Sequence, residues 1–297
     1  MSISLATVVL LLLSLSQTTV CSTSAIITAL CPTDCSCSMI EGGRLRLSVD
    51  CHGRVEVDGG QLSMQLDTLL SVNLTYGRLR ELSIVNSPLT LVPRSVCRLT
   101  SLTRLRLDNN RLTRLPDNCL TNLTSLLSLG APRNSITGLQ DGLFDGLRQL
   151  DRLELTGNRI SSIGLRVFNG SSMLTSLKYV DLSYNRIQTL EPWPDYVGIN
   201  GRRLSKAPID LSFNRISSFT NMMGWKARCD SKIVYFILTL SYNPIKHIRH
   251  VTWLEHEHSD DGVYDSTYSH CIITYSFPRC QTRLRLCRLR CSQDSIF

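Results

Sequence analysis

The chain has 297 residues, of which 42% are hydrophobic and 19% are charged, and its formal net charge is +8. After the N-terminus no stretch approaches the roughly 18 apolar residues of a membrane span, so we expect no such span. The polar, basic C-terminus argues against a lipid-anchor signal. No recognised nucleic-acid-binding motif accompanies the basic residues, so nucleic acid is not an expected partner.

The N-terminal residues 1–22 predict a signal peptide. Residues 6–15 form an apolar core of suitable length, and small residues lie near Cys21 and Ser22, where cleavage is expected. A secreted chain agrees with the twelve cysteines, because disulfides persist in oxidising compartments. We therefore expect a secreted, extracellular protein.

A cysteine-rich segment follows at residues 31–58, and we expect it to cap the first turn of the fold. The need is physical, because the first unit of a repeating structure has no neighbour to bury its apolar end. The sequence alone allows three pairings among its cysteines. These cysteines are Cys31, Cys35, Cys37 and Cys51. The transitional residues that follow, up to 78, are expected to form one strand and, at 59–78, a degenerate repeat.

Residues 79–250 contain seven copies of one phrase, of which LKYVDLSYNRI at 177–187 is a regular example. We number the positions of each copy as slots, starting from its first residue. Slots 4, 11 and 14 are apolar in all seven copies, and slot 9 is asparagine in six of them. Consecutive slot-9 asparagines are 24 to 29 residues apart, which is typical of a leucine-rich repeat. These asparagines are Asn110, Asn134, Asn158, Asn185, Asn214 and Asn243.

The spacing of the slots predicts an α/β solenoid. Slots 4 and 6 alternate with a period of two, so each copy predicts one short strand whose apolar side faces inward. One copy cannot bury that side alone, whereas stacked copies bury a continuous core. The slot-9 asparagine lies where the chain turns out of the strand. Stacked in a buried column, these amides can satisfy backbone groups that water does not reach.

The outward-facing strand residues, in slots 3, 5, 7 and 8, are the candidate ligand-binding face. Slot 5 brings three acidic residues into line, which we expect to lie in open solvent, and slot 8 brings three aromatic residues alongside. The aromatic residues have two open interpretations: a protein-binding hot spot, or rings that stabilise the sheet by packing on one another. The candidate binding residues are Glu154, Asp181, Asp210, Tyr184, Phe213 and Tyr242.

Further features fit an extracellular solenoid. Cys97 and Cys119 lie in adjacent repeats, and because neighbouring coils are ~4.8 Å apart a disulfide between them is feasible. Two reduced, half-buried cysteines are the alternative. Three glycosylation sequons each precede a strand, so sugars there would leave the binding face clear. The sequons are at Asn73, Asn122 and Asn169.

Arginine repeats at slot 10, beside the asparagine column. Anionic glycans or acidic proteins are candidate partners for such a column, and a solvated face that keeps the solenoid soluble is the alternative. The slot-10 arginines are Arg111, Arg159, Arg186 and Arg215.

We expect no catalytic residues, no metal, no cofactor and therefore no enzyme. The sequence contains no nucleophile elbow, phosphate loop or HExxH motif. Residues 251–297 lose the repeat and are expected to form an irregular, basic, cysteine-containing tail. The histidines around it match no strong zinc spacing and are interpreted as part of a solvated loop. They are His247, His250, His256 and His258, next to Asp260 and Asp261.

The capped repeats resemble the extracellular leucine-rich-repeat superfamily, and within it the ectodomains of Toll-like receptors, particularly those of invertebrates. The phrases at 180–185 and 209–214, and the inserts LEPWP at 190–194 and FTNMMGW at 219–225, carry this similarity. The resemblance implies a curved horseshoe with parallel strands on its concave face and irregular or short helical segments on its convex side. It also implies the disulfides Cys31–Cys37 and Cys35–Cys51 in the cap.

The chain departs from that family in two respects. It contains no membrane helix and no cytoplasmic signalling domain, and its C-terminal cysteines do not follow the usual cap spacing. Five cysteines are left over, so that a free thiol, pairing with another chain or a truncated gene product are all open. They are Cys229, Cys271, Cys280, Cys287 and Cys291.

Two functions follow from the sequence. The first is a secreted recognition protein of the innate-immune, Toll-like type, which binds a protein or glycan ligand and engages a receptor partner or dimerises. The second is a small extracellular-matrix or cell-adhesion protein that binds matrix proteins or glycans. The ligand itself is not encoded in the fold, because repeat proteins vary their exposed slots on one scaffold.

Overall fold

The computed structural model describes residues 23–32, 35–40, 45–51, 59–71, 79–116, 119–164, 167, 176–189, 209–220, 235–244, 247–249, 270–276 and 287–292. The predicted signal peptide and the sequons at Asn73 and Asn169 lie outside these residues, as do His250, His256, His258, Asp260 and Asp261 of the histidine cluster. The same is true of the side chains of the five C-terminal cysteines, whose pairing stays open.

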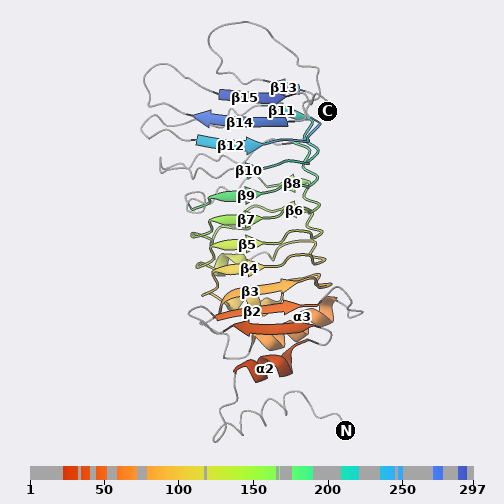
Figure 1. Ribbon diagram of the computed structural model, residues 1–297, viewed down its shortest axis with the longest axis vertical. Coiled ribbons are helices and arrows are strands. Elements are labelled where there is room, and N and C mark those ends of the chain that lie inside the picture. Colours follow the sequence, from red (N-terminus) through yellow and green to blue (C-terminus); the bar gives the residue numbers. More distant parts are fainter. Residues whose placement is uncertain are drawn as a thin grey trace, which may run out of the picture.

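One long sheet dominates the described residues, with its strands stacked like rungs (Figure 1). Neighbouring strands of this sheet from β2 to β12 pair in parallel. β2 belongs to the cap, and each of the other seven strands belongs to one repeat. This confirms the predicted parallel-strand solenoid. The strands are β2 (Leu45–Asp50), β3 (Leu79–Val85), β4 (Arg104–Arg106), β5 (Ser128–Gly130), β7 (Arg152–Glu154), β9 (Tyr179–Asp181), β10 (Ile209–Asp210) and β12 (Tyr235–Thr239).

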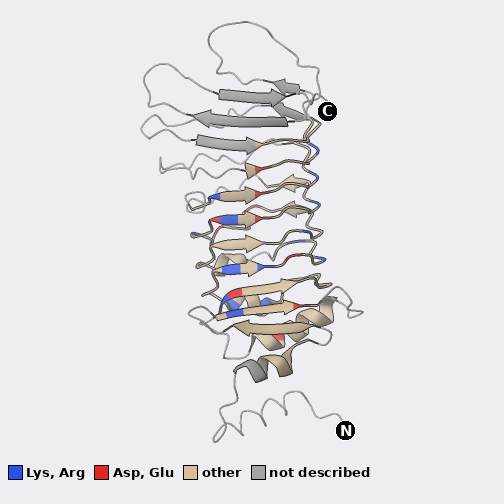
Figure 2. Cartoon of the chain, in the orientation of Figure 1, with Lys and Arg blue, Asp and Glu red and all other residues tan. Residues whose placement is uncertain are grey.

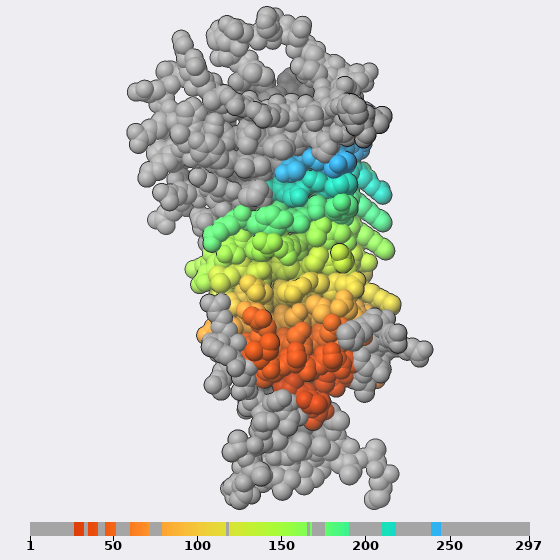
Figure 3. Space-filling view, in the orientation of Figure 1, coloured from red at the N-terminus to blue at the C-terminus, as the bar shows by residue number. Residues whose placement is uncertain are grey.

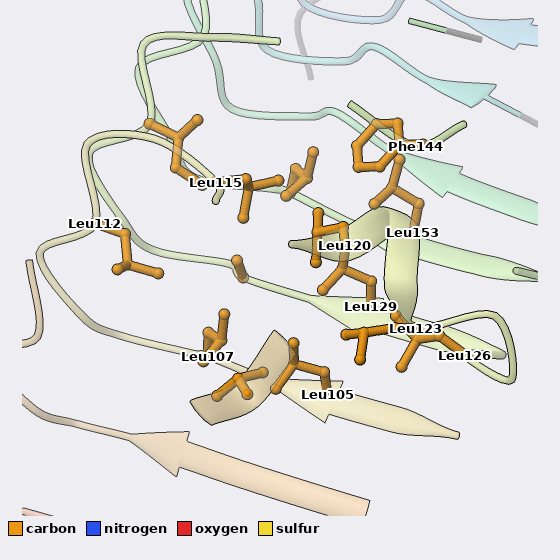
Figure 4. Packing of buried hydrophobic residues seen from close by; sticks show 14 of the residues in the cluster. Leu105, Leu107, Leu112, Leu115, Leu120, Leu123, Leu126, Leu129, Phe144 and Leu153 are labelled. Atoms are coloured by element: carbon orange, nitrogen blue, oxygen red, sulfur yellow. The ribbon is translucent and has the colours of Figure 1, made fainter. Parts of the chain in front are cut away.

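The strand register follows the slots. Slot 4 of each copy lies opposite slot 4 of the next, as in the pairs of Leu105 with Leu129 and of Leu153 with Val180. The described slot-4 and slot-11 side chains are at most 1% exposed. Figure 4 shows leucines of successive repeats filling the space between the two limbs of the coil, together with Phe144. The core is therefore a continuous column rather than a set of separate cores.

The limb opposite the sheet consists of turns, short strands and single helical turns, as predicted. The 3-10 helices are η2 (Arg94–Arg98) and η3 (Leu120–Asn122). The short strands β6 (Gly138–Leu139) and β8 (Ser162–Ile163) pair in parallel, as do β11 (Ser218–Thr220) and β13 (His247–Arg249). Between η2 and the start of η3, Cys97 and Cys119 form a disulfide with a Cα–Cα distance of 4.8 Å.

The N-terminal cap covers the first rung of the sheet. It contains the disulfides Cys31–Cys37 and Cys35–Cys51, which are the pairs that the resemblance implies. Strand β1 (Ser36–Ile40) pairs antiparallel with β2, and the preceding helix α2 (Thr23–Leu30) places Ile27, only 1% exposed, in the core. The repeat pattern does not predict this helix, because the helix is short and lies outside the repeats.

Two further segments differ from expectation. Where the transitional residues 52–78 were expected to contain a strand, the described part is the helix α3 (Gly59–Leu70), which buries Leu62, Leu66 and Leu69. These leucines recur at helical spacing, so together they form the buried face of the helix. In place of a wholly irregular tail, strands β14 (His270–Ser276) and β15 (Cys287–Ser292) pair antiparallel and extend the sheet beyond β12.

The slot-9 asparagines form a buried ladder that ties each repeat to the one before it. The Nδ2 of Asn158 donates to the carbonyl of Ala131 in the preceding repeat at 2.9 Å and to that of Leu155 in its own repeat at 3.0 Å. Its Oδ1 accepts from the N–H of Ile136 at 3.0 Å. Equivalent bonds recur at the neighbouring asparagines, all of which are 4 to 7% exposed.

At the first copy, serine replaces asparagine. The hydroxyl of Ser87 donates to Oδ1 of Asn110, and Ser87 is 4% exposed. The amide of Asn110 still donates to the carbonyl of Ile84 at 2.8 Å. The shorter serine side chain is therefore tolerated here, because Asn110 of the next repeat accepts its hydrogen bond.

We expect Asn158→Ala to lower the free energy of unfolding by about 1–3 kcal/mol, because it leaves two carbonyls and one N–H buried without this partner. Thermal unfolding followed by calorimetry measures the loss. The neighbouring exposed substitution Arg159→Ala is the matched control and should change stability by less than about 0.5 kcal/mol. An Asn158→Ala protein that unfolds at the temperature of the control contradicts the ladder's structural role.

Candidate ligand-binding face

The three slot-5 acids lie in one row across neighbouring strands. Glu154 is paired in register with Asp181, and Asp181 with Asp210. They do not lie in open solvent, however, because all three are only partly exposed. That expectation is wrong for a specific reason: Oδ1 of Asp181 accepts from the backbone N–H and the hydroxyl of Ser183, at 2.9 and 2.6 Å.

The same use of the carboxylate recurs in the next repeat, where Oδ1 of Asp210 accepts from the backbone N–H of Ser212 at 2.9 Å. These aspartates therefore hold the turn that leaves the strand. Ser183 and Ser212, which occupy the supposedly outward slot 7, are 6 and 7% exposed. Asp181 and Asp210 therefore keep their charge, but part of their hydrogen-bonding capacity is used within the protein.

Many of the other charged side chains on the sheet face form ion pairs. Arg152 forms an ion pair with Glu154, and its guanidinium lies 4.5 Å from the ring centre of Tyr179 on the next strand. Figure 2 shows these basic and acidic positions side by side on β7. Burial, followed by the charges of Asp181 and Asp210, raises the pKa of Tyr179, so its hydroxyl stays protonated at neutral pH.

A similar pattern holds nearer the N-terminus. Glu81, only 8% exposed, lies 2.7 Å from Nε of Arg46 and 3.6 Å from Arg104. Arg106 pairs with Asp108, and this hydrogen bond is the main cause that raises the pKa of Arg106. Because its charges are largely matched within the protein, the strand surface does not present a strong field of one sign.

Slot 8 has a backbone conformation that the sequence analysis missed. Its non-glycine residues have φ values of 51 to 57°, and Gly157 has φ 70°. This left-handed region is uncommon for residues other than glycine and asparagine. The sequence does contain a sign of this conformation, because two asparagines and one glycine occupy slot 8. Its members are Asn86, Asn109, Arg133, Gly157, Tyr184, Phe213 and Tyr242.

The three slot-8 aromatics form one continuous stack. The ring centres of Tyr184 and Phe213 are 4.1 Å apart with planes at 9°, and those of Phe213 and Tyr242 are 4.2 Å apart with planes at 13°. The rings also stay accessible, with Tyr184 56%, Phe213 37% and Tyr242 48% exposed. The geometry therefore fits both interpretations of the aromatic residues: the rings pack on one another, as sheet stabilisation requires, and they stay exposed, as a binding hot spot requires.

The slot-10 arginines run parallel to this stack, two residues further along each repeat. Their backbone N–H groups bond to the slot-11 carbonyl of the preceding repeat, as from Arg159 to Ile136 at 2.9 Å and from Arg186 to Ile160 at 2.9 Å. Their side chains are exposed. We call slots 8 and 10 together the turn edge. Basic positions recur along this edge in Figure 2, and side chains project from it in a row in Figure 3.

Two other sites stand apart from this face. Asn122 is exposed at the end of η3, on the limb opposite the sheet, as glycan attachment would require. Among the described residues, no three histidine, cysteine, aspartate or glutamate side chains are placed to hold a metal ion. Within the same part of the chain, none of the helices has the length and apolar character needed to cross a membrane.

Comparison with known proteins identifies the repeat. Residues 101–123 and 132–187 match family models described as leucine-rich repeats. No curated protein sequence matches the chain. Solved structures match with modest TM-scores, and one of them is the TLR13–ssRNA13 complex, with 23% identity and TM-score 0.43, covering 58% of this chain and 23% of that one.

Two further structures are similar to the chain. The leucine-rich-repeat domain of APL1B has 19% identity and TM-score 0.41, with 84% of this chain and 62% of that one covered. Toll, in its complex with Spatzle in Drosophila, has 24% identity and TM-score 0.40, with 60% and 26% covered. This chain spans less than two thirds of each of the three proteins. Together with the in-register strands and the asparagine ladder, the family matches show that this chain contains leucine-rich repeats.

Proposed function

We propose that the protein is a secreted recognition protein of the innate-immune, Toll-like type. It binds a protein or glycan ligand through the sheet face and the turn edge, and then engages a receptor partner or dimerises. The observation that carries the proposal is the exposed stack of Tyr184, Phe213 and Tyr242. Large aromatic side chains are left in water on a surface whose charged groups are mostly paired.

The stack suits a binding hot spot for two physical reasons. Its rings are held by one another and by a constrained backbone, so little side-chain entropy is lost when a ligand covers them. Aromatic residues are also the side chains that most often dominate binding energy at protein interfaces. The acids in slot 5 have a smaller part in this proposal, because Asp181 and Asp210 already hold their turns.

An extracellular location rests on several features of the chain. Three disulfides are present in the described residues, and disulfides persist outside the reducing cytosol. The N-terminal residues have the pattern of a signal peptide. Glycosylation at Asn122, if it occurs, would leave the sheet face and the turn edge clear, because Asn122 lies on the opposite limb.

The alternative function is that of a matrix or adhesion protein that binds anionic glycans. The column of exposed slot-10 arginines favours it, since charges repeated once per coil match a linear anionic polymer. The two functions differ in which column of the turn edge makes the dominant contacts. In the first it is the aromatic stack, and in the second it is the arginine column.

We expect Tyr184→Ala combined with Phe213→Ala to weaken ligand binding at least about tenfold, because two interface aromatics are removed. Candidate ligands are tested by surface plasmon resonance on the immobilised chain: lipopolysaccharide, peptidoglycan and the ectodomain of a Toll-like receptor. Leu91→Ala is the control, because Leu91 is 48% exposed but lies outside the two columns. If the double variant and the control bind a captured ligand equally well, the stack is not the binding site.

Heparin chromatography separates the two functions. If the arginine column makes the dominant contacts, the chain should stay bound to heparin at salt concentrations well above physiological, and replacing Arg159, Arg186 and Arg215 by glutamine should bring elution down to about 0.15 M salt. We expect the wild-type chain to elute early, with only the weak retention of its net charge of +8. Strong retention lost in the triple variant favours the matrix function over our proposal.

A further inference from the structure

The aromatic stack has an open end within the described residues, and that end is at Gly157. Gly157 occupies slot 8 immediately before Tyr184, and its N–H bonds to the carbonyl of Ser183 at 3.0 Å, so the two repeats are aligned. Tyr184 contacts Phe213 on one side, but Gly157 has no side chain to cover the other. The exposures agree, since Tyr184 is 56% exposed and the enclosed Phe213 only 37%.

Gly157 leaves space for a side chain beside this ring, next to Arg133. A Cβ placed on Gly157 would lie 3.5 Å from Cγ of Arg133 and 3.6 Å from its backbone nitrogen, which is ordinary van der Waals contact. Neighbouring rings in the stack are 4.1 and 4.2 Å apart, close to one repeat step. A ring brought in by a ligand could therefore continue the stack over Gly157, at the spacing the protein already uses.

The charges around this position select the kind of ring. Arg133 occupies slot 8 on the far side of Gly157, and Arg159 and Arg186 are exposed at slot 10 of the adjoining repeats. Glu154 is ion-paired with Arg152, whereas Asp181 is hydrogen-bonded to the neutral Ser183 and keeps its charge. The three arginines outnumber this one acid that has no cation partner among the described residues. The surroundings are basic, and an arginine next to an aromatic ring adds a cation–π attraction.

We propose that the open face of Tyr184, above Gly157, receives one aromatic side chain from an acidic segment of a protein partner, flanked by Arg133 and Arg159. The inference rests on the proposed function, since it assumes that the turn edge binds ligands, and it specifies the contact. A protein segment fits better than single-stranded nucleic acid. Successive bases need successive open ring faces, whereas rings that stack on one another leave a single face here.

The test uses a short acidic peptide with a central tryptophan, and the full chain in two variants. Gly157→Asn covers the ring face, and Tyr184→Asn removes the ring. Asparagine already occupies slot 8 at Asn86 and Asn109 with φ 51 and 55°, so neither variant should disturb the backbone. Isothermal titration should show each variant binding the peptide about two- to tenfold more weakly than wild type, as expected for one lost aromatic contact.

Controls show where on the protein the peptide binds and whether the contact needs an aromatic side chain. Leu91→Ala, which changes an exposed side chain outside both columns, should bind the peptide as wild type does. The same peptide with alanine in place of tryptophan should bind wild type more weakly and be insensitive to Gly157→Asn. Equal binding by wild type and Gly157→Asn overturns the inference. So does an equal loss in Leu91→Ala, or oligodeoxyadenylate that binds more tightly than the peptide with the same dependence on Gly157.

These outcomes are distinguishable from failure of the proposed function. If Gly157→Asn has no effect while the double variant at Tyr184 and Phe213 still loses a captured ligand, the turn edge binds ligands but not through the open ring face. If the double variant also binds every ligand normally, the proposed function itself fails.

Discussion

The hydrogen bonds of the slot-9 asparagines are the constraint on which the rest of this structure depends. From Asn134 onward, each amide donates to a carbonyl of its own repeat and to one of the preceding repeat, and accepts an N–H from that preceding repeat, as at Asn214. The bonds therefore fix the turn that leaves each strand and the step to the next coil at once. No apolar contact could do both, because hydrophobic burial has no direction.

The binding surface is a consequence of that constraint. Because every turn is held in the same way, the residue before each asparagine adopts the same left-handed conformation, and its side chain projects in the same direction as its neighbours. Aromatic residues placed there must stack, and arginines two residues later must form a second column. On the strands themselves most charged side chains form ion pairs or hydrogen bonds within the protein. The side chains that remain available to bind a ligand therefore lie at the turn edge rather than at the centre of the sheet.

The sequence predicted the repeated parts of the fold well and the unrepeated parts poorly. Apolar residues in slots 4 and 11 recur seven times, so a single departure elsewhere in a copy, such as Ser87 in slot 9, does not hide the pattern. Helices α2 and α3 and strands β14 and β15 occur once each, so no repetition along the chain reveals them, and only α3 has leucines at helical spacing. At the site, the alignment of Glu154, Asp181 and Asp210 was predictable from spacing. The bond from Ser183 to Asp181 was not, because it depends on turn geometry that spacing does not specify.

Hydrogen exchange at the slot-11 amides tests the central claim most directly. The N–H of Ile160 is bonded to Oδ1 of Asn185 at 2.9 Å, and that of Leu112 to Oδ1 of Asn134 at 3.0 Å. In Asn185→Ala, exchange at Ile160 should accelerate by about ten- to a hundredfold more than at Leu112, because one rung of the ladder is lost locally. Equal changes at the two amides would show that the asparagines do not hold the individual turns, and would contradict this account.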